Sequence, residues 1–199
     1  MSVYPAVRDT VEPYAIYEEV FTPDECDAIV KSISALGLKD SVVNTVTGQN
    51  VFETVEDVRK SKTRFLLPTD SDYNSNWLFE RLLDVTMDAN NKFFGFNLWG
   101  FAEGIQFAEY EAPGGKYDFH IDKAYGNIIR KLSLSVNLTD PSTYEGGDLE
   151  LMYSPKAEKI KRDRGTVILF PSYTLHRVTP VTSGVRNSLV AWITGDTFQ

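Results

Sequence analysis

Three side chains in this sequence have the types and spacing needed to bind a divalent metal ion. The chain has only two histidines, His120 and His176, and Asp122 follows the first of them two positions later. Residues 118–122 are predicted to form a strand, in which residues two apart point to the same face, so His120 and Asp122 would offer neighbouring ligands. His176, in another short predicted strand, is the candidate third ligand.

Two histidines and one carboxylate on one face of a metal form the ligand set of non-haem Fe(II) oxygenases, which leaves three coordination positions open. A core histidine hydrogen-bonded to an aspartate, without any metal, is the alternative explanation. Arg186 adds a second feature, because an arginine can bind a carboxylate through two charge-assisted hydrogen bonds. In the predicted strand 185–194 it shares one face with Ser188, Val190 and Trp192, which suits a pocket for a small dicarboxylate. A surface salt bridge is the alternative for Arg186.

The predicted strand 130–138 separates apolar from polar residues by parity. Its apolar face consists of Leu132, Leu134, Val136 and Leu138, and its polar face of Lys131, Ser133, Ser135 and Asn137. On an ordinary antiparallel sheet the polar face would be solvated, whereas inside a roll it would line a wet active site. The parity of this strand leaves both arrangements open.

Two amphipathic helices precede the strands that carry these residues. The first is predicted from Thr22 to Gly37, because Thr22 and Glu25 have the spacing of a capping box and a glycine ends the apolar stripe. The second is predicted from about Ser75 to Phe93 on its apolar stripe. Residues 40–67 between them are predicted to be extended, with a turn at 47–50.

The C-terminal half has the pattern of a β-domain. Short runs rich in β-branched residues alternate with Gly, Pro and Asp clusters, and they predict strands at 104–111, 118–122, 130–138, 148–152, 165–170, 174–179 and 185–194. Many short strands favour a sandwich, barrel or jelly roll. We expect one α+β unit over residues 1–199, with helical and extended support over 1–97 and the metal site in the sheets of 98–199.

Composition excludes several classes of protein. The net charge of −8 argues against a nucleic acid or an anionic membrane as the main partner, since both require a basic face. Cys26 is the only cysteine, so neither an intrachain disulfide nor a multi-cysteine zinc site can form. No apolar run suits a signal peptide or a membrane span. We therefore expect a soluble, cytoplasmic protein, and its oligomeric state stays open.

A set of short motifs carries a family resemblance between Phe107 and Trp192. In chain order they are Tyr110, His120-x-Asp122, RKLSLSVNLTD at 130–140, EGGDL at 145–149, Gly165 with Phe170-Pro171, LHRVTPV at 175–181 and GVRNS at 184–188. This segment resembles the 2-oxoglutarate- and Fe(II)-dependent dioxygenases, specifically the prolyl 4-hydroxylase-like branch and its bacterial PKHD-type relatives. The stretches at 21–26 and 58–61 are also similar to that branch.

The resemblance implies a double-stranded β-helix (jelly roll) with supporting N-terminal helices. It implies His120, Asp122 and His176 as iron ligands. It implies that Arg186 holds the distal carboxylate of 2-oxoglutarate, with further contacts from Tyr110, Ser188, Trp192 and Gln106. Asn137 occupies the position where related prolyl hydroxylases often carry a tyrosine that touches the co-substrate, so an amide contact is expected there instead.

The resemblance also implies a reaction. The enzyme would be an oxidoreductase that uses Fe(II), 2-oxoglutarate and O₂, with ascorbate as a reductant, and that releases succinate and CO₂ while hydroxylating proline in a peptide or protein. The carboxylate ligand Asp122 favours hydroxylation, because related halogenases lack it. Hydroxylation of a free amino acid or another small molecule, a non-catalytic metal-binding module and a nucleic-acid demethylase are the alternatives. The loop at 41–60 is a candidate lid over the substrate.

Overall fold

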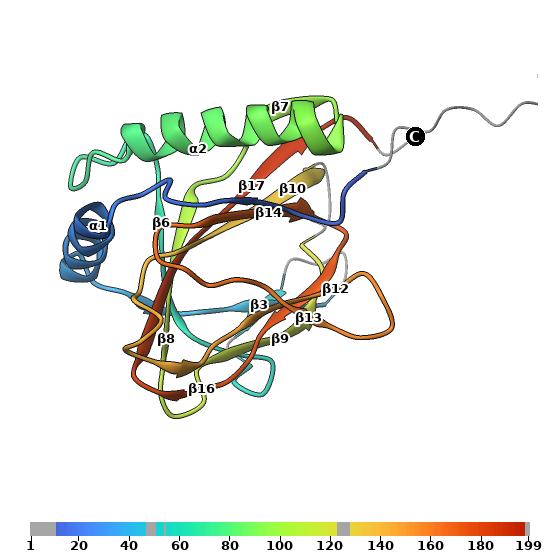
Figure 1. Ribbon diagram of the computed structural model, residues 1–199. Coiled ribbons are helices and arrows are strands. Elements are labelled where there is room, and N and C mark those ends of the chain that lie inside the picture. The colour runs from blue at the N-terminus through green and yellow to red at the C-terminus, as the bar shows by residue number, and fades with distance from the viewer. Residues whose placement is uncertain (1–10, 47–50, 54, 123–127, 198–199) are drawn as a thin grey trace, which may run out of the picture.

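The larger of two main sheets forms the centre of the molecule (Figure 1). The computed structural model describes residues 11–46, 51–53, 55–122 and 128–197. In this sheet the strand order is β1-β14-β10-β17-β8-β6-β2, with β7 paired to β17 and neighbours antiparallel. Its strands are β1 (Ala15–Tyr17), β2 (Lys39–Asp40), β6 (Lys62–Leu66), β7 (Leu98–Phe101), β8 (Ile105–Glu111), β10 (Arg130–Asn137), β14 (Val167–Pro171) and β17 (Val185–Gly195).

The smaller sheet carries both histidines. Its order is β13-β12-β15-β9-β5, and its strands are β5 (Arg59–Lys60), β9 (Lys116–His120), β12 (Leu149–Met152), β13 (Glu158–Lys159) and β15 (Leu175–Val178). Two further antiparallel pairs join β3 (Val43–Val46) to β4 (Val51–Glu53) and β11 (Glu145–Gly146) to β16 (Val181–Ser183). The two main sheets form a jelly roll, as predicted. The turn expected at 47–50, between β3 and β4, lies outside the described residues.

The first 97 residues do more than support the roll from outside. Besides two helices, they supply β5 to the smaller sheet and β1, β2 and β6 to the larger one. The pairing of β6 with β8 and of β5 with β9 therefore joins the N-terminal segment to both layers.

The first helix begins as its sequence predicts. Helix α1 (Pro23–Ala35) has a complete capping box, in which the Glu25 amide donates to Thr22 Oγ1 at 3.2 Å and the Thr22 amide donates to Glu25 Oε2 at 2.9 Å. These bonds satisfy amide groups that have no partner within the helix. Both oxygens of Glu25 also accept from Arg81 Nη1 at 2.8 Å, which ties α1 to the second helix.

The second helix differs from the prediction at its C-terminal end. Helix α2 (Asn76–Ala89) continues into a π-helical turn, η1 (Asn90–Phe94). A π turn inserts extra chain relative to an α-helix and so shifts the residues that follow it around the axis. The predicted stripe ended on Phe93, but Phe93 is 36% exposed, and Phe94, at 5%, enters the core instead.

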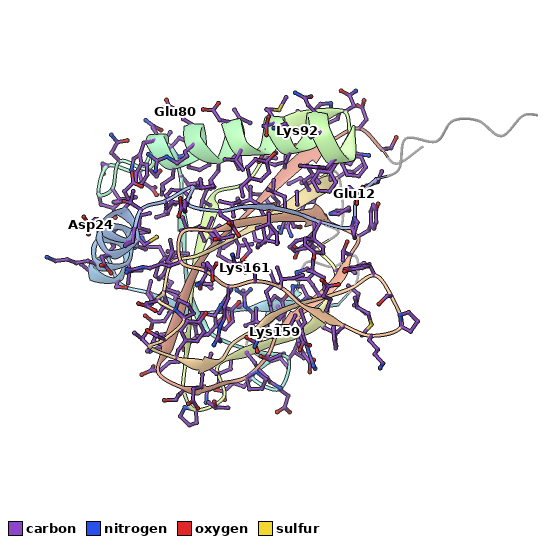
Figure 2. All side chains as sticks on the ribbon, in the orientation of Figure 1. Glu12, Asp24, Glu80, Lys92, Lys159 and Lys161 are labelled. Atoms are coloured by element: carbon purple, nitrogen blue, oxygen red, sulfur yellow. The ribbon has the colours of Figure 1, made fainter. Side chains whose placement is uncertain are left out.

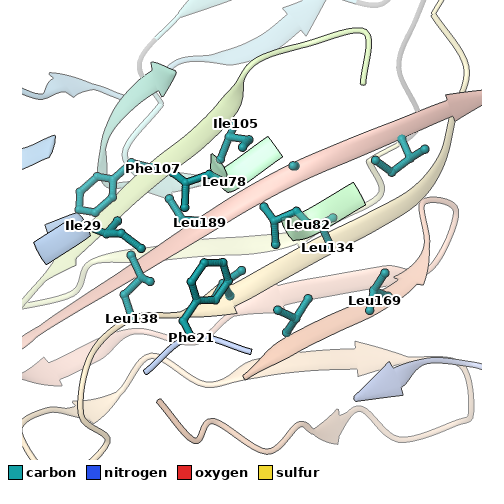
Figure 3. Packing of buried hydrophobic residues seen from close by; sticks show 14 of the residues in the cluster. Phe21, Ile29, Leu78, Leu82, Ile105, Phe107, Leu134, Leu138, Leu169 and Leu189 are labelled. Carbon is teal, nitrogen blue, oxygen red and sulfur yellow. The ribbon is translucent and has the colours of Figure 1, made fainter. Parts of the chain in front are cut away.

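The main hydrophobic core lies between the two helices and the outer face of the larger sheet (Figure 3). Ile29 of α1 and Leu78 and Leu82 of α2 pack there with residues of β10 and β17 such as Leu134 and Leu189. The charged residues Asp24 and Glu80 lie at the outer edge of the helical layer (Figure 2). In the described part of the chain, neither helix is long and apolar enough to cross a membrane.

This packing decides the orientation of β10. The even-numbered residues from Leu132 to Val136 belong to the core beneath the helices. Ser133 and Ser135, on the opposite face, are buried between the two sheets. The two serines of the polar face therefore point into the roll and are not solvated, whereas Lys131, beside a shift of register in β10, lies over the Phe96 ring.

Candidate active site

The two histidines face each other on adjacent strands of the smaller sheet. His120, the last residue of β9, is the direct register partner of His176 in β15, and their ring centroids lie 4.1 Å apart. Asp122 was predicted to belong to the same strand as His120, but β9 ends at His120 and the Asp122 amide donates to the carbonyl of Ser172 instead. Its side chain nevertheless turns toward both imidazoles.

The donor atoms of these three residues are close enough to bind one ion. Asp122 Oδ1 lies 3.5 Å from His120 Nε2, and Asp122 Oδ2 lies 3.5 Å from His176 Nε2. All three donor atoms lie within 4.8 Å of one another. Donors at about 2.0–2.2 Å from a shared ion are at most about 4.4 Å apart, so small side-chain adjustments suffice to close the site around a metal.

Backbone carbonyls and aromatic rings orient both imidazoles. Nδ1 of His120 lies 2.7 Å from the carbonyl of Asp118, and Nδ1 of His176 lies 2.9 Å from that of Thr174. Since a carbonyl only accepts, each Nδ1 carries the proton, and each Nε2 presents its lone pair to the site. The Tyr117 ring stacks on His120 with centroids 3.5 Å apart.

The protonation states suit metal ligands. Burial by itself would raise the pKa of Asp122, but the neighbouring histidines and the hydrogen bond from Ser133 Oγ, at 2.7 Å from Oδ2, together hold that pKa well below its usual range. Burial lowers the pKa of His176, and although the Asp122 carboxylate opposes this shift, the net direction is downward. An ionised carboxylate and a neutral imidazole are the forms that coordinate a divalent cation. The donor set therefore fits Fe(II).

Arg186 is a buried cation in the cavity between the sheets. The cavity has a volume of about 1480 Å³ and reaches from the three ligands to Arg186, which is 3% exposed. Its guanidinium donates to Ser188 Oγ at 3.4 Å and lies 5.4 Å from the centre of the Tyr110 ring. No carboxylate of the described residues is within ion-pair distance of it, which removes the surface salt bridge as an explanation. A buried charge needs an anionic partner, so the residues fit 2-oxoglutarate.

Two other predicted pocket residues also line this cavity. Gln106 is buried, and its Oε1 accepts from Arg59 Nη2 at 2.9 Å. The guanidinium carbon of Arg130 lies 3.9 Å from the centre of the Trp192 ring. The buried Nε1 of Trp192 has no hydrogen-bond partner among the described residues.

Asn137 is the predicted contact that the structure argues against. Its Nδ2 donates to the carbonyls of Thr139 at 2.8 Å and Arg162 at 2.6 Å, and its Oδ1 accepts from Tyr144 at 3.4 Å. The amide is thus used to hold loop backbone, and its side chain does not line the cavity described above. Strand parity placed Asn137 on the correct face, but the local loops occupy its hydrogen-bonding groups.

The sequence analysis did not single out Arg130, whose guanidinium contacts the backbone of the candidate ligand Asp122. It forms a two-pronged ion pair with Glu103, with both N···O distances at 2.6 Å, and donates to the carbonyl of Asp122 at 3.2 Å. No local signal links these residues, because Glu103 is 27 positions away and the sheet brings it close. Ser133 was on the polar face of its strand, but its bond to Asp122 appears only in three dimensions.

The sequence offers Trp99, Tyr117, Phe119 and Tyr125 as candidate contacts for a peptide substrate, and the structure separates them. Tyr117 lines the cavity. Phe119 instead lies under the guanidinium of Arg177 at 4.5 Å. Trp99 is 70% exposed on β7 and does not line the cavity. Tyr125, the remaining candidate, lies outside the described residues.

Comparison with known proteins agrees with this geometry. Residues 105–194 match the family model of the 2OG-Fe(II) oxygenase superfamily. A PKHD-type hydroxylase of Synechococcus sp. is 46% identical over 84 residues, which cover 42% of this chain and 38% of that protein. Another PKHD-type hydroxylase, from Klebsiella pneumoniae, is 35% identical over 125 residues, which cover 58% of this chain and 55% of that protein. The matched segments thus span less than two thirds of these relatives.

Solved structures share the fold over most of the chain. The crystal structure of a Pseudomonas putida prolyl-4-hydroxylase superposes with a TM-score of 0.70 at 18% identity and covers 93% of this chain and 94% of its own. A second structure is a prolyl hydroxylase from Trichoplax adhaerens in complex with a hypoxia inducible factor oxygen degradation domain peptide fragment. It superposes with a TM-score of 0.73 at 19% identity and covers 92% of this chain and 84% of its own. Residues 105–194 therefore match the 2OG-Fe(II) oxygenase superfamily in sequence, and the chain is similar to PKHD-type hydroxylases and shares the fold of prolyl hydroxylases.

Proposed function

We propose that this protein is an Fe(II)- and 2-oxoglutarate-dependent dioxygenase that hydroxylates proline in a peptide or protein and releases succinate and CO₂. The observation that carries the proposal is one cavity with two complementary features. Three ligands of the non-haem iron type lie in it, and so does the buried guanidinium of Arg186, which has no acidic partner among the described residues. The two features match the two components that such a reaction requires.

The roles of the residues follow from their positions. His120, Asp122 and His176 would hold Fe(II), which supplies the capacity to activate O₂ when bound. Arg186 would bind the distal carboxylate of 2-oxoglutarate, with Ser188 and Tyr110 beside it. Because the sheets exclude bulk water from this end of the cavity, the charge-assisted hydrogen bonds of Arg186 are stronger there than at the surface.

The size of the cavity supports a substrate larger than an amino acid. Sites for small molecules usually occupy about 300–1,000 Å³, and this cavity, at about 1480 Å³, exceeds that range. Exposed apolar side chains of the lining extend the site outward to the surface, and they are Val42, Val58, Phe65, Ile121 and Ile128. An apolar channel of this kind suits an extended peptide, and one of the related structures described above holds a peptide.

A direct assay tests the proposal. Purified protein with Fe(II), 2-oxoglutarate, O₂ and ascorbate as reductant is offered a library of proline-containing peptides, and succinate and the gain of one oxygen atom on proline are measured. We expect both products, and His120→Ala should abolish them. Formation of succinate with free proline but with no peptide would contradict the peptide substrate. Metal binding without any succinate formation would indicate a non-catalytic module.

A further inference from the structure

Arg59 is a second buried cation of the same cavity. It is the first residue of β5, is 7% exposed and lines the cavity. Its Nε donates to Ser61 Oγ at 3.0 Å and its Nη2 donates to Gln106 Oε1 at 2.9 Å. Its guanidinium covers the Tyr117 ring at 4.5 Å. All three partners are neutral.

The charge of Arg59 is therefore not balanced within the described part of the chain. Among the four described arginines that line the cavity, Arg64 pairs with Asp72 and Arg130 pairs with Glu103. Arg186 is the proposed partner of the co-substrate. No described carboxylate is within ion-pair distance of Arg59, and Nη1 has no recorded acceptor there. An arginine stays protonated when buried, so this site favours an anion from outside.

The position of Arg59 is close to one of the three candidate metal ligands. Tyr117 lies between the guanidinium of Arg59 and the ring of His120. The centre of the Tyr117 ring is 4.5 Å from the guanidinium carbon of Arg59 and 3.5 Å from the centre of the His120 ring. The guanidinium is consequently no more than about 8 Å from the His120 ring. An extended peptide advances about 3.3 Å per residue, so this distance corresponds to about two residues.

We propose that Arg59 binds the carboxylate of an Asp or Glu side chain within about two residues of the hydroxylated position of the substrate. This inference rests on the proposed function and names the class of peptide that the site selects. The net charge of −8 repels an acidic peptide only weakly at long range, because charges more than about 8–10 Å apart are screened at physiological salt. The buried and closely placed Arg59 is screened much less.

Matched peptides test this inference. Short peptides with a central proline are made in pairs that carry Asp or Asn at one neighbouring position, and their binding to protein with Fe(II) and 2-oxoglutarate is measured anaerobically by fluorescence anisotropy. At one or more positions within two residues of proline, the Asp peptide should bind at least about tenfold more tightly than its Asn partner, as expected for a charge-assisted bond. In Arg59→Gln the ratio of the dissociation constants of the Asn and Asp peptides, called the Asp/Asn ratio below, should fall to about one. Arg59→Lys should retain part of the preference for Asp.

Lys60→Gln is the matched control. It removes the same charge from the adjacent residue, but Lys60 Nζ donates to the carbonyl of Pro113 at 3.1 Å and does not line the cavity. The Asp/Asn ratio should therefore persist in Lys60→Gln. A ratio near one in the wild type at every position, an unchanged ratio in Arg59→Gln, or no peptide binding at all would overturn the inference. The proposed function fails separately, through absence of succinate in the aerobic assay.

Discussion

The arginines of this protein differ in whether a carboxylate of the same chain balances their charge. Arg130 has Glu103 and Arg177 has Glu150, and both pairs hold the structure around the cavity. Arg186 has neither a carboxylate partner among the described residues nor access to bulk solvent. Burying a charge is unfavourable unless a partner compensates for it, so the two buried arginines without a described carboxylate partner, Arg186 and Arg59, are the ones assigned to ligands.

Replacement of Arg186 tests that assignment. Arg186→Gln would remove the two charge-assisted hydrogen bonds proposed for 2-oxoglutarate, each typically contributing about 1.5–3 kcal/mol, so the dissociation constant of 2-oxoglutarate should rise at least about 100-fold. Isothermal titration with 2-oxoglutarate in the presence of a divalent ion measures this change. Arg177→Gln, which alters an ion pair outside the cavity, should change the constant little. Equal affinity of wild type and Arg186→Gln would refute the assignment.

The role of the Ser133 hydroxyl, which hydrogen-bonds to the candidate ligand Asp122, can also be tested. Ser133 Oγ donates to Asp122 Oδ2 and lies 2.9 Å from Ser172 Oγ. Partners of this kind orient a ligand, and their loss typically weakens metal binding about 10–100-fold. Ser133→Ala should weaken Co(II) binding by that amount, as measured by optical absorption of the bound ion. Ser135→Ala, on the same face of β10 but without a bond to Asp122, should bind Co(II) as the wild type does.

At the scale of elements, the N-terminus of α1 forms the capping box that its sequence predicts. Thr22 and Glu25 form the capping box within four residues, and α2 adds Arg81 to it. The Thr22 amide, and then Arg81, hold the pKa of Glu25 below its usual value. Local hydrogen bonding starts the helix, and tertiary contact reinforces it.

Glu25 therefore links stability to pH. Its lowered pKa means that the ionised form stabilises the folded state above the ordinary carboxyl value of about 4.3, and that this contribution is lost as pH falls through the lowered pKa. At pH 7 Glu25→Gln should cost about 0.5–1 kcal/mol of unfolding free energy, since the group is half-buried and partly screened. Urea denaturation should show the cost disappearing at strongly acidic pH. A cost independent of pH, or an equal one in the outward-pointing Glu80→Gln, would contradict this account.

For the whole molecule, the two sheets bring together residues that are far apart in the chain. Antiparallel pairing of β9 with β15 sets His120 against His176, and β10 on the other sheet supplies Ser133 to Asp122. Metal binding should therefore stabilise the complete roll, because the three donors converge only when it is folded.

Thermal unfolding measures this coupling. A divalent ion at about 100 times its dissociation constant adds about 2.7 kcal/mol, which for a domain of this size corresponds to about 5–10 °C in the melting temperature. The wild type should show this rise with Co(II) or Mn(II). Asp122→Ala should show almost none, although its own melting temperature differs from that of the wild type. A similar rise in both proteins would place the bound ion elsewhere.

Much of the fold was predictable from local patterns. The capping box at Thr22, the apolar stripe of α2 and the seven C-terminal strands appear close to their predicted limits, because periodicity and turn residues act over a few positions. The π turn at 90–94 was missed, since no local pattern specifies it. The hydrogen bonds of Asn137 to the carbonyls of Thr139 and Arg162 were not predicted, because these partners come from loops whose course the strand pattern does not describe.

Residue types and spacing alone were enough to nominate His120, Asp122, His176 and Arg186, because the chain has no other histidine and strand parity groups the rest. They could not show that Ser133 faces the roll, that Glu103 neutralises Arg130, or that Arg59 has only neutral described partners. Those facts depend on which groups lie close in space after two sheets pack, and on which charges lose contact with water. Short-range periodicity carries no information about either, so only the tertiary structure separates the charges that hold the fold from the charges available to ligands.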